Sequence, residues 1–77
     1  MLSAYVLIES EVGKVAHVAR ALAKVDGVQM AEDLAGPYDV IARVEASGLD
    51  ELGRLIVSRI QALDGVTRTL TCMVLHR

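Results

Sequence analysis

The sequence predicts an α+β domain in which two helices cover one face of a four-stranded antiparallel sheet. Apolar segments with strand-like composition alternate with segments whose apolar residues recur at helical spacing. The chain has 77 residues, a length that allows one domain. Leu63-Asp64-Gly65-Val66 echoes Val25-Asp26-Gly27-Val28 about half a chain later. These observations indicate two similar halves, each of the type strand, helix, strand.

The elements are expected in the order β-α-β-β-α-β, which is the ferredoxin-like arrangement. Residues 2–8, 28–34, 40–44 and 66–75 are apolar and rich in β-formers. The first helix has an apolar stripe made of Val15, Val18, Ala19, Leu22 and Val25. The second has a stripe made of Leu49, Leu52, Ile56, Ile60 and Leu63. Gly27 and Gly65 are expected to end the helices in a left-handed conformation, and Ser47 with Asp50 resembles a capping box.

Composition and charge exclude several classes of function. The net charge of −2 and the pI near 5.5 argue against a protein built to hold nucleic acid. No apolar run approaches the length of a membrane span, and the N-terminus lacks the pattern of a signal peptide. We therefore expect a cytoplasmic domain without membrane or direct nucleic-acid contacts. The single cysteine, Cys72, excludes an internal disulfide.

One face of the predicted sheet is expected to lie open, because two helices can cover only the other face. Strict alternation assigns to the covered face Ala4, Val6, Ile8, Val40, Ala42, Val44, Leu70, Cys72 and Val74. It assigns to the open face Tyr5, Leu7, Ile41, Arg43, Glu45, Thr69, Thr71, Met73 and Leu75. Such a face approaches the largest apolar patch that a monomer tolerates, about 300–600 Å². We predict a homodimer joined sheet to sheet through Tyr5, Leu7, Ile41, Arg43, Met73 and Leu75.

Catalytic and metal-binding constellations find little support. His17 is expected on a solvated helix face and His76 beside the C-terminus, with no Cys/His spacing that suits zinc. Cys72 is expected in the core, without a base to activate it. We therefore predict no enzyme activity, cofactor or metal. The segment Gly36-Pro37-Tyr38-Asp39 is more informative, since loop N–H groups and the Asp39 carboxylate suit the two ends of a zwitterion. The alternative is an ordinary turn in which Asp39 bonds its own backbone.

Two stretches resemble the effector-binding domain of the Lrp/AsnC regulators, also called the regulation of amino-acid metabolism domain. They are Leu34-Ala35-Gly36-Pro37-Tyr38-Asp39-Val40-Ile41-Ala42-Arg43-Val44 and Leu63-Asp64-Gly65-Val66-Thr67-Arg68-Thr69. The resemblance covers essentially the whole chain. It implies that subunits pair through their sheets, commonly assemble into a ring of four dimers, and bind an amino acid or related effector between dimers. Carried over by position, the ligand-binding residues would be Asp33, Gly36, Tyr38, Asp39, Leu49, Thr71, Cys72 and Met73.

Typical members of this family carry a helix-turn-helix segment before the domain, whereas this chain starts at the first strand. We therefore expect a single effector-binding domain without a DNA-binding domain, acting through partners such as full-length Lrp/AsnC regulators. A small enzyme of the dimeric α+β barrel class is one alternative, which needs a polar group such as His17 to face the interior. An ACT-type regulatory module, with Gly13 in the first strand–helix loop, is another.

Overall fold

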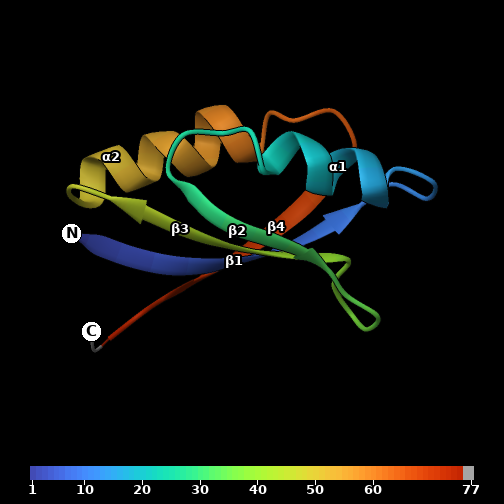
Figure 1. Ribbon diagram of the computed structural model, residues 1–77, viewed down its shortest axis with the longest axis horizontal. Helices are drawn as coiled ribbons and strands as arrows, with labels where there is room; N and C mark the ends of the chain where they lie inside the picture. Colours follow the sequence, from blue (N-terminus) through green and yellow to red (C-terminus); the bar gives the residue numbers. More distant parts are fainter. Residues whose placement is uncertain (76–77) are drawn as a thin grey trace.

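The computed structural model describes residues 1–75 as one four-stranded sheet with helices on one side (Figure 1). The first half comprises β1 (Leu2–Ser10), α1 (Val15–Leu22) and β2 (Val28–Asp33). The second half comprises β3 (Val40–Ala46), α2 (Leu49–Arg54), the π-helical segment η1 (Leu55–Ile60) and β4 (Val66–Met73). The predicted ferredoxin-like α+β fold is confirmed. His76 lies outside the described residues.

The strands lie in the order β2-β3-β1-β4, and all neighbouring strands are antiparallel. Residues directly opposite each other in such a pair share a face of the sheet. On the helix side, Val6 stands opposite Ala42 and Ile8 opposite Val40, and all four are fully buried. The core between sheet and helices includes Ala4, Val6, Ile8, Val18, Leu22, Val40, Ala42, Val44, Leu52, Leu55, Ile56 and Ile60.

The predicted alternation of the last strand is wrong by one residue. Thr71 stands opposite Val6, and Met73 stands opposite Ala4. Both side chains therefore lie on the helix side of the sheet, not on the open face. The expectation that Met73 helps to form a sheet-to-sheet interface loses its basis, since it rested on the open face.

Leu70 and Cys72 take the place of these residues on the open face. Leu70 stands opposite Leu7, and Cys72 opposite Tyr5. Cys72 is exposed, so the prediction that it packs in the core is wrong. Leu75 follows the end of β4 and is exposed. Alternation did not reveal the phase because Leu, Thr, Cys and Met suit either side of a partly covered edge strand. Pairing with β1 sets the phase instead.

The second helical stretch buries a different set of side chains from the predicted stripe. Leu52, Ile56 and Ile60 are buried as expected, but Leu49 is 69% exposed and Leu55 joins the core. The hydrogen bonding changes at Leu55 from the α to the π type. A stripe drawn at a period of 3.6 residues does not fit a helix whose turn widens midway.

The helix ends confirm one prediction and correct another. Gly27 and Gly65 have the expected left-handed φ angles, 96° and 98°, but they lie in the turns before β2 and β4 and do not cap the helices, whose C-caps are Ala23 and Gln61 in right-handed conformation. Ser47 and Asp50 form no capping box, because Gly48 is the N-cap and has no side chain to donate or accept. Instead the Ser47 N–H donates to Glu51 Oε1 over 2.7 Å. This hydrogen bond stabilises the carboxylate and lowers the pKa of Glu51.

No helix within residues 1–75 has the length and apolar character needed to cross a bilayer.

Candidate functional site

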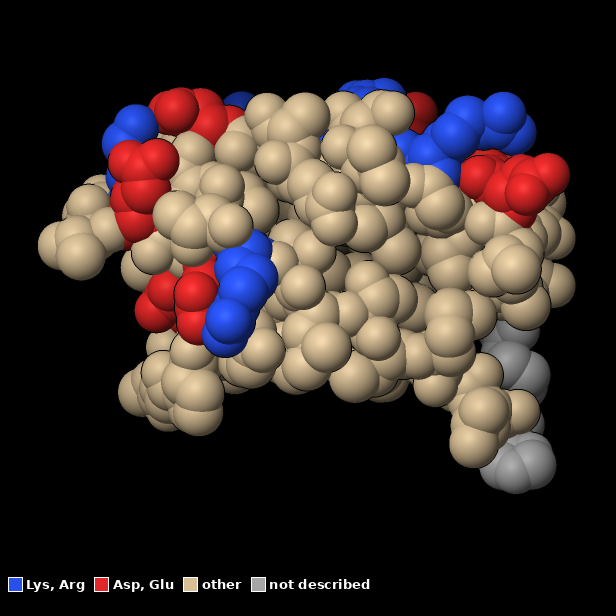
Figure 2. Space-filling model, turned by 180° about the vertical axis from the view of Figure 1, so that it is seen from behind, with Lys and Arg blue, Asp and Glu red and all other residues tan. Residues whose placement is uncertain are grey.

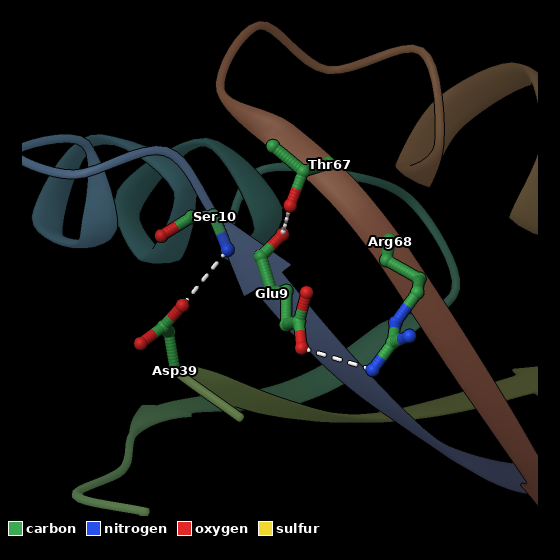
Figure 3. Close-up of polar contacts among 5 residues, drawn as sticks. All are labelled: Glu9, Ser10, Asp39, Thr67 and Arg68. Atoms are coloured by element: carbon green, nitrogen blue, oxygen red, sulfur yellow. Dashed lines mark hydrogen bonds and ion pairs between the residues drawn. The ribbon is translucent and has the colours of Figure 1, made fainter. Parts of the chain in front are cut away.

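Asp39 anchors the loop of residues 34–39 to the end of β1. Its N–H donates to the Ile8 carbonyl over 2.9 Å, and its carbonyl accepts from the Leu34 N–H over 2.8 Å. Its Oδ2 accepts from the Ser10 N–H over 2.9 Å (Figure 3). The alternative of a bond to its own backbone is therefore not what the structure shows. Asp39 makes no ion pair with any other residue in the range 1–75, so its carboxylate keeps the capacity to meet an ammonium group.

A charged group from β1 and β4 lies beside this loop. Arg68 Nη2 is 3.0 Å from Glu9 Oε2, and the Thr67 hydroxyl donates to the Glu9 carbonyl over 3.1 Å (Figure 3). The Arg68 guanidinium also lies 6.0 Å from the centroid of the Tyr38 ring. We name Glu9, Ser10, Tyr38, Asp39, Thr67 and Arg68 the loop cluster. It combines carboxylates, a guanidinium and a phenol within one subunit.

The sequence reasoning missed four members of the loop cluster: Glu9, Ser10, Thr67 and Arg68. One signal was available, because Glu9 and Arg68 carry opposite charges near the ends of two strands that were expected in the same sheet. Their pairing opposite each other depends on the register of β1 with β4, which alternation did not provide. A hollow of about 310 Å³ adjoins the cluster, lined by Gln61, Val66, Thr67, Arg68 and Thr69.

Part of the predicted ligand-binding set comes together in this region. Gly36, Tyr38 and Asp39 share the loop, and Asp33 is the exposed last residue of β2 just before it. Gly36 lacks a left-handed φ, and a Cβ placed on it would meet no atom within 4 Å, so the fold itself does not require glycine there. A reason for glycine at this position would have to come from outside the subunit.

The rest of the predicted set lies elsewhere in the subunit. Leu49 begins α2 beyond the far end of β3, at the opposite end of the molecule from the loop (Figure 1). Met73 stands opposite Ala4, near the N-terminal end of β1, and Thr71 and Cys72 precede it. One subunit does not gather these residues around the loop, so any shared pocket would need a second subunit.

The open face of the sheet is apolar at its centre and carries polar pairs that include Tyr5 with Arg43, Ser3 with Glu45 and Glu9 with Arg68. Its apolar members are Tyr5, Leu7, Met30, Ile41, Leu70 and Cys72. Arg43 Nη1 donates to the Tyr5 hydroxyl over 2.9 Å, and its guanidinium lies 5.2 Å from the centroid of the Tyr5 ring. Leu70 is 46% exposed although it is a large apolar side chain. No helix of the described subunit covers this face (Figure 1).

Neither grouped metal ligands nor an inward-facing His17 is found in the described part of the chain. Within residues 1–75, no three His, Cys, Asp or Glu side chains are grouped so that they could hold a metal ion. The His17 side chain is exposed, and its Nε2 lies 3.9 Å from Asp64 Oδ2. It points away from the core, as the predicted phase of the first helix required.

The sequence profile of the Lrp/AsnC ligand binding domain matches residues 3–77. The chain belongs to this family. A crystal structure of a Thermus thermophilus protein has a TM-score of 0.93 and 31% identity, over 100% of this chain and 96% of that one.

Two curated relatives are larger proteins. One is an uncharacterized HTH-type transcriptional regulator of Pyrococcus abyssi, 35% identical over 55 residues that make up 71% of this chain. The other is a homocitrate synthase of Sulfurisphaera tokodaii, 39% identical over 60 residues that make up 78% of this chain. The chain spans only 37% of the regulator and 13% of the synthase. Segments similar to this chain therefore occur in proteins with different printed names, one a regulator and one a synthase.

Proposed function

We propose that this domain binds an amino acid or a related small effector and passes the signal to partner proteins through self-assembly, without contacting DNA itself. The observation that carries the proposal is the open apolar sheet face, which needs a second copy to shelter it from water. Its family membership supports a regulatory, ligand-binding role. We place its action in the cytoplasm, together with transcriptional regulators.

The loop cluster supports binding of a zwitterion. The Asp39 carboxylate suits an ammonium group, and the Arg68 guanidinium and loop N–H groups suit a carboxylate. Because Leu49 and Met73 lie far from the loop within one subunit, we propose that neighbouring dimers in a ring of four complete the pocket. Binding in the µM to mM range would correspond to about 4–8 kcal/mol.

Sedimentation at micromolar concentration tests the assembly. We expect a dimer or a multiple of dimers, with eight chains for a complete ring, and Leu70→Lys should shift the distribution toward single subunits. Val57→Lys is the matched control, because Val57 is an exposed apolar residue on the outer side of η1. A wild-type chain that stays folded and monomeric at these concentrations would remove the basis of the proposal.

Calorimetry with the twenty amino acids tests the effector. We expect heat of binding for one chemical class, and weaker binding for Asp39→Asn with assembly retained. If none of the twenty amino acids gives heat of binding at millimolar concentration, the proposed effector role is wrong. Matched measurements on Glu11→Gln, an exposed carboxylate outside the predicted ligand-binding set and the loop cluster, would show whether any loss is specific to Asp39.

The absence of direct DNA contacts is tested by mobility shift. Figure 2 shows charged side chains of both signs gathered toward two ends of the molecule, with a broad uncharged area between them. A nucleic-acid footprint needs clustered positive charge instead. We expect no retardation of DNA by this domain alone at physiological salt. Retardation that appears only on mixing with a full-length Lrp/AsnC regulator would support action through such a partner.

A small enzyme is the less favoured alternative. Enzymes of the dimeric α+β barrel class need a polar cavity between sheet and helices, but here that space is occupied by fully buried apolar side chains such as Val6, Val18 and Leu22. The exposed position of His17 leaves no histidine in the described part of the chain to face such a cavity. The match to homocitrate synthase covers only 13% of that enzyme.

A further inference from the structure

A second hollow lies at the opposite end of the sheet from the loop cluster. It has a volume of about 400 Å³, at the lower end of the range for small-molecule sites, about 300–1,000 Å³. The turn before β2, the end of β3 and the helical stretch α2–η1 enclose it. Its lining residues are Asp26, Gly27, Glu45, Ala46, Glu51, Arg54, Leu55, Ser58 and Arg59.

Two arginines, Arg54 and Arg59, are among the residues that line this hollow. Neither Arg54 nor Arg59 makes a hydrogen bond or an ion pair with another residue in the range 1–75. Arg68 and Arg43, by contrast, both have partners. A guanidinium presents several N–H donors in a planar fork, which matches a carboxylate. The arginine side of the hollow therefore suits the carboxylate end of a ligand.

Carboxylates line the same hollow. Asp26 makes no hydrogen bond or ion pair with another of the described residues through its side chain. Glu51 is held by the Ser47 N–H, and the nearby charge of Arg54 adds to the lowering of its pKa, so that it stays anionic at neutral pH. Glu45 borders the hollow as well, but its carboxylate accepts from Ser3 Oγ on the open face of the sheet, so two acidic residues, Asp26 and Glu51, share the lining with the two arginines. A ligand that carries both charges fits this lining better than a simple anion does.

Apolar atoms complete the lining. Leu55 and Ala46 contribute from η1 and β3, and Leu55 is 9% exposed. Leu55, Ser58 and Arg59 all belong to the π-helical segment. Turns of the π type are rare in helices and occur frequently at functional sites.

From this lining we infer that each subunit carries a second ligand site, built between the Asp26-Gly27 turn and the α2–η1 helix, which takes a small zwitterion of the α-amino-acid class. The guanidiniums of Arg54 and Arg59 receive the carboxylate, Asp26 receives the ammonium group, and Leu55 contacts the ligand side chain. The inference rests on the proposed binding of amino acids and assigns it a site complete within one subunit. The loop cluster then serves as a separate site.

Nuclear magnetic resonance titration with the amino-acid panel tests the inference, because backbone amide shifts report where a ligand binds. We expect shifts at Gly27, Ala46 and Ser58, and a dissociation constant raised at least tenfold in the double variant Arg54→Gln/Arg59→Gln. Arg20→Gln is the matched control, since Arg20 is an exposed arginine on α1 outside the hollow, and should bind as the wild type does. Circular dichroism of each variant verifies folding.

The outcomes separate this inference from the proposed function. Shifts confined to residues 34–39, with unchanged binding by the double arginine variant, would overturn the second site and leave amino-acid binding intact. Amide shifts both at residues 34–39 and near Gly27 would support the second site if the double arginine variant loses only those near Gly27. If no amino acid in the panel binds at all, the second site and the proposed effector role both fall.

Discussion

The Asp26-Gly27 and Asp64-Gly65 turns occupy equivalent places in the two halves of the fold. Among the described residues, an ion pair is formed at only one of the two turns. At the Asp64-Gly65 turn, Lys14 Nζ lies 2.8 Å from Asp64 Oδ2, and His17 adds a more distant contact. The hydrogen bond between Lys14 and Asp64 raises the pKa of Lys14 and lowers the pKa of Asp64. At the Asp26-Gly27 turn, the aspartate borders the hollow of about 400 Å³ instead.

The backbones of the two turns obey the same constraint. Gly27 and Gly65 have φ angles of 96° and 98°, and each lies against the helical stretch of the other half. A Cβ on Gly65 would meet Val18 Cγ2 at 3.1 Å, and one on Gly27 would meet Leu55 Cδ2 at 3.0 Å. The repeated backbone therefore does not dictate whether an Asp-Gly turn is closed by an ion pair or borders a hollow. We call the Asp26-Gly27 turn with its hollow the open corner. The surrounding side chains decide it, which makes the open corner a property of this sequence.

The largest expected effect comes from the wall of the open corner. Leu55→Ala removes a buried side chain and should lower the free energy of unfolding by about 3 kcal/mol. Leu49→Ala, in the same helical stretch but exposed, should lower it by less than about 0.5 kcal/mol. Urea denaturation measures both. Equal losses would mean that Leu55 is not an integral part of the core and that the corner is only loosely built.

The next largest effect comes from the turn glycines. Gly65→Ala and Gly27→Ala should each cost about 2 kcal/mol, because a Cβ is strained at positive φ and has a close contact. Gly36→Ala is the control and should change stability by less than about 0.5 kcal/mol, since open space surrounds it. Thermal unfolding at a fixed protein concentration checks the ranking. A loss for Gly36→Ala as large as for the other two would contradict it.

Replacing the two aspartates should give a smaller and asymmetric effect. Asp64→Asn removes the ion pair with Lys14 and should lower the melting temperature slightly at low salt. The difference from wild type should shrink in concentrated salt, because the pair is exposed and screened. Asp26→Asn should produce no such loss. Scanning calorimetry at two salt concentrations makes the comparison, and equal losses would show that the two corners are not electrostatically different.

The smallest effect is a dependence of stability on pH. The pKa values of Asp64 and Glu51 are lowered by hydrogen bonds made in the folded state. Their contribution is present above the ordinary carboxyl pKa of about 4 and is lost as pH falls through the lowered values. Lys14 behaves oppositely, because its raised pKa adds stability that is lost at strongly alkaline pH. In acid titrations, Asp64→Asn should reduce the slope of stability against pH below about pH 4, and an unchanged slope would contradict the contribution of the Lys14–Asp64 pair.

The fold was predictable because its signals are local. Apolar periodicity placed all four strands and both helical regions, and the two Asp-Gly pairs marked the turns that lead into β2 and β4, although the helices themselves end earlier, at Leu22 and Ile60. The phase of β4 was not predictable, because Thr71, Cys72 and Met73 are similar enough in polarity to suit either face. The change from α to π hydrogen bonding at Leu55 likewise follows from packing, and no residue type or spacing in the sequence predicts it.

The candidate site was only partly predictable for a related reason. Gly36, Tyr38 and Asp39 are close together in the chain, so their loop could be identified directly. Ser10 and Arg68 reach Asp39 and Tyr38 across sequence separations that no local pattern encodes. The hollow at Arg54 and Arg59 was missed altogether, since in the sequence those arginines are typical of an ordinary solvated helix face.

By itself the sequence determined the order of the elements, the left-handed turns and the core of β1 and β3, because each depends on the preference or spacing of neighbouring residues. Only the tertiary structure decided which face Cys72 occupies, what Asp39 binds and which corner stays open. Those properties depend on strand register and on contacts between segments that are far apart in the sequence. The free energy of such contacts cannot be read from the residues of one segment alone.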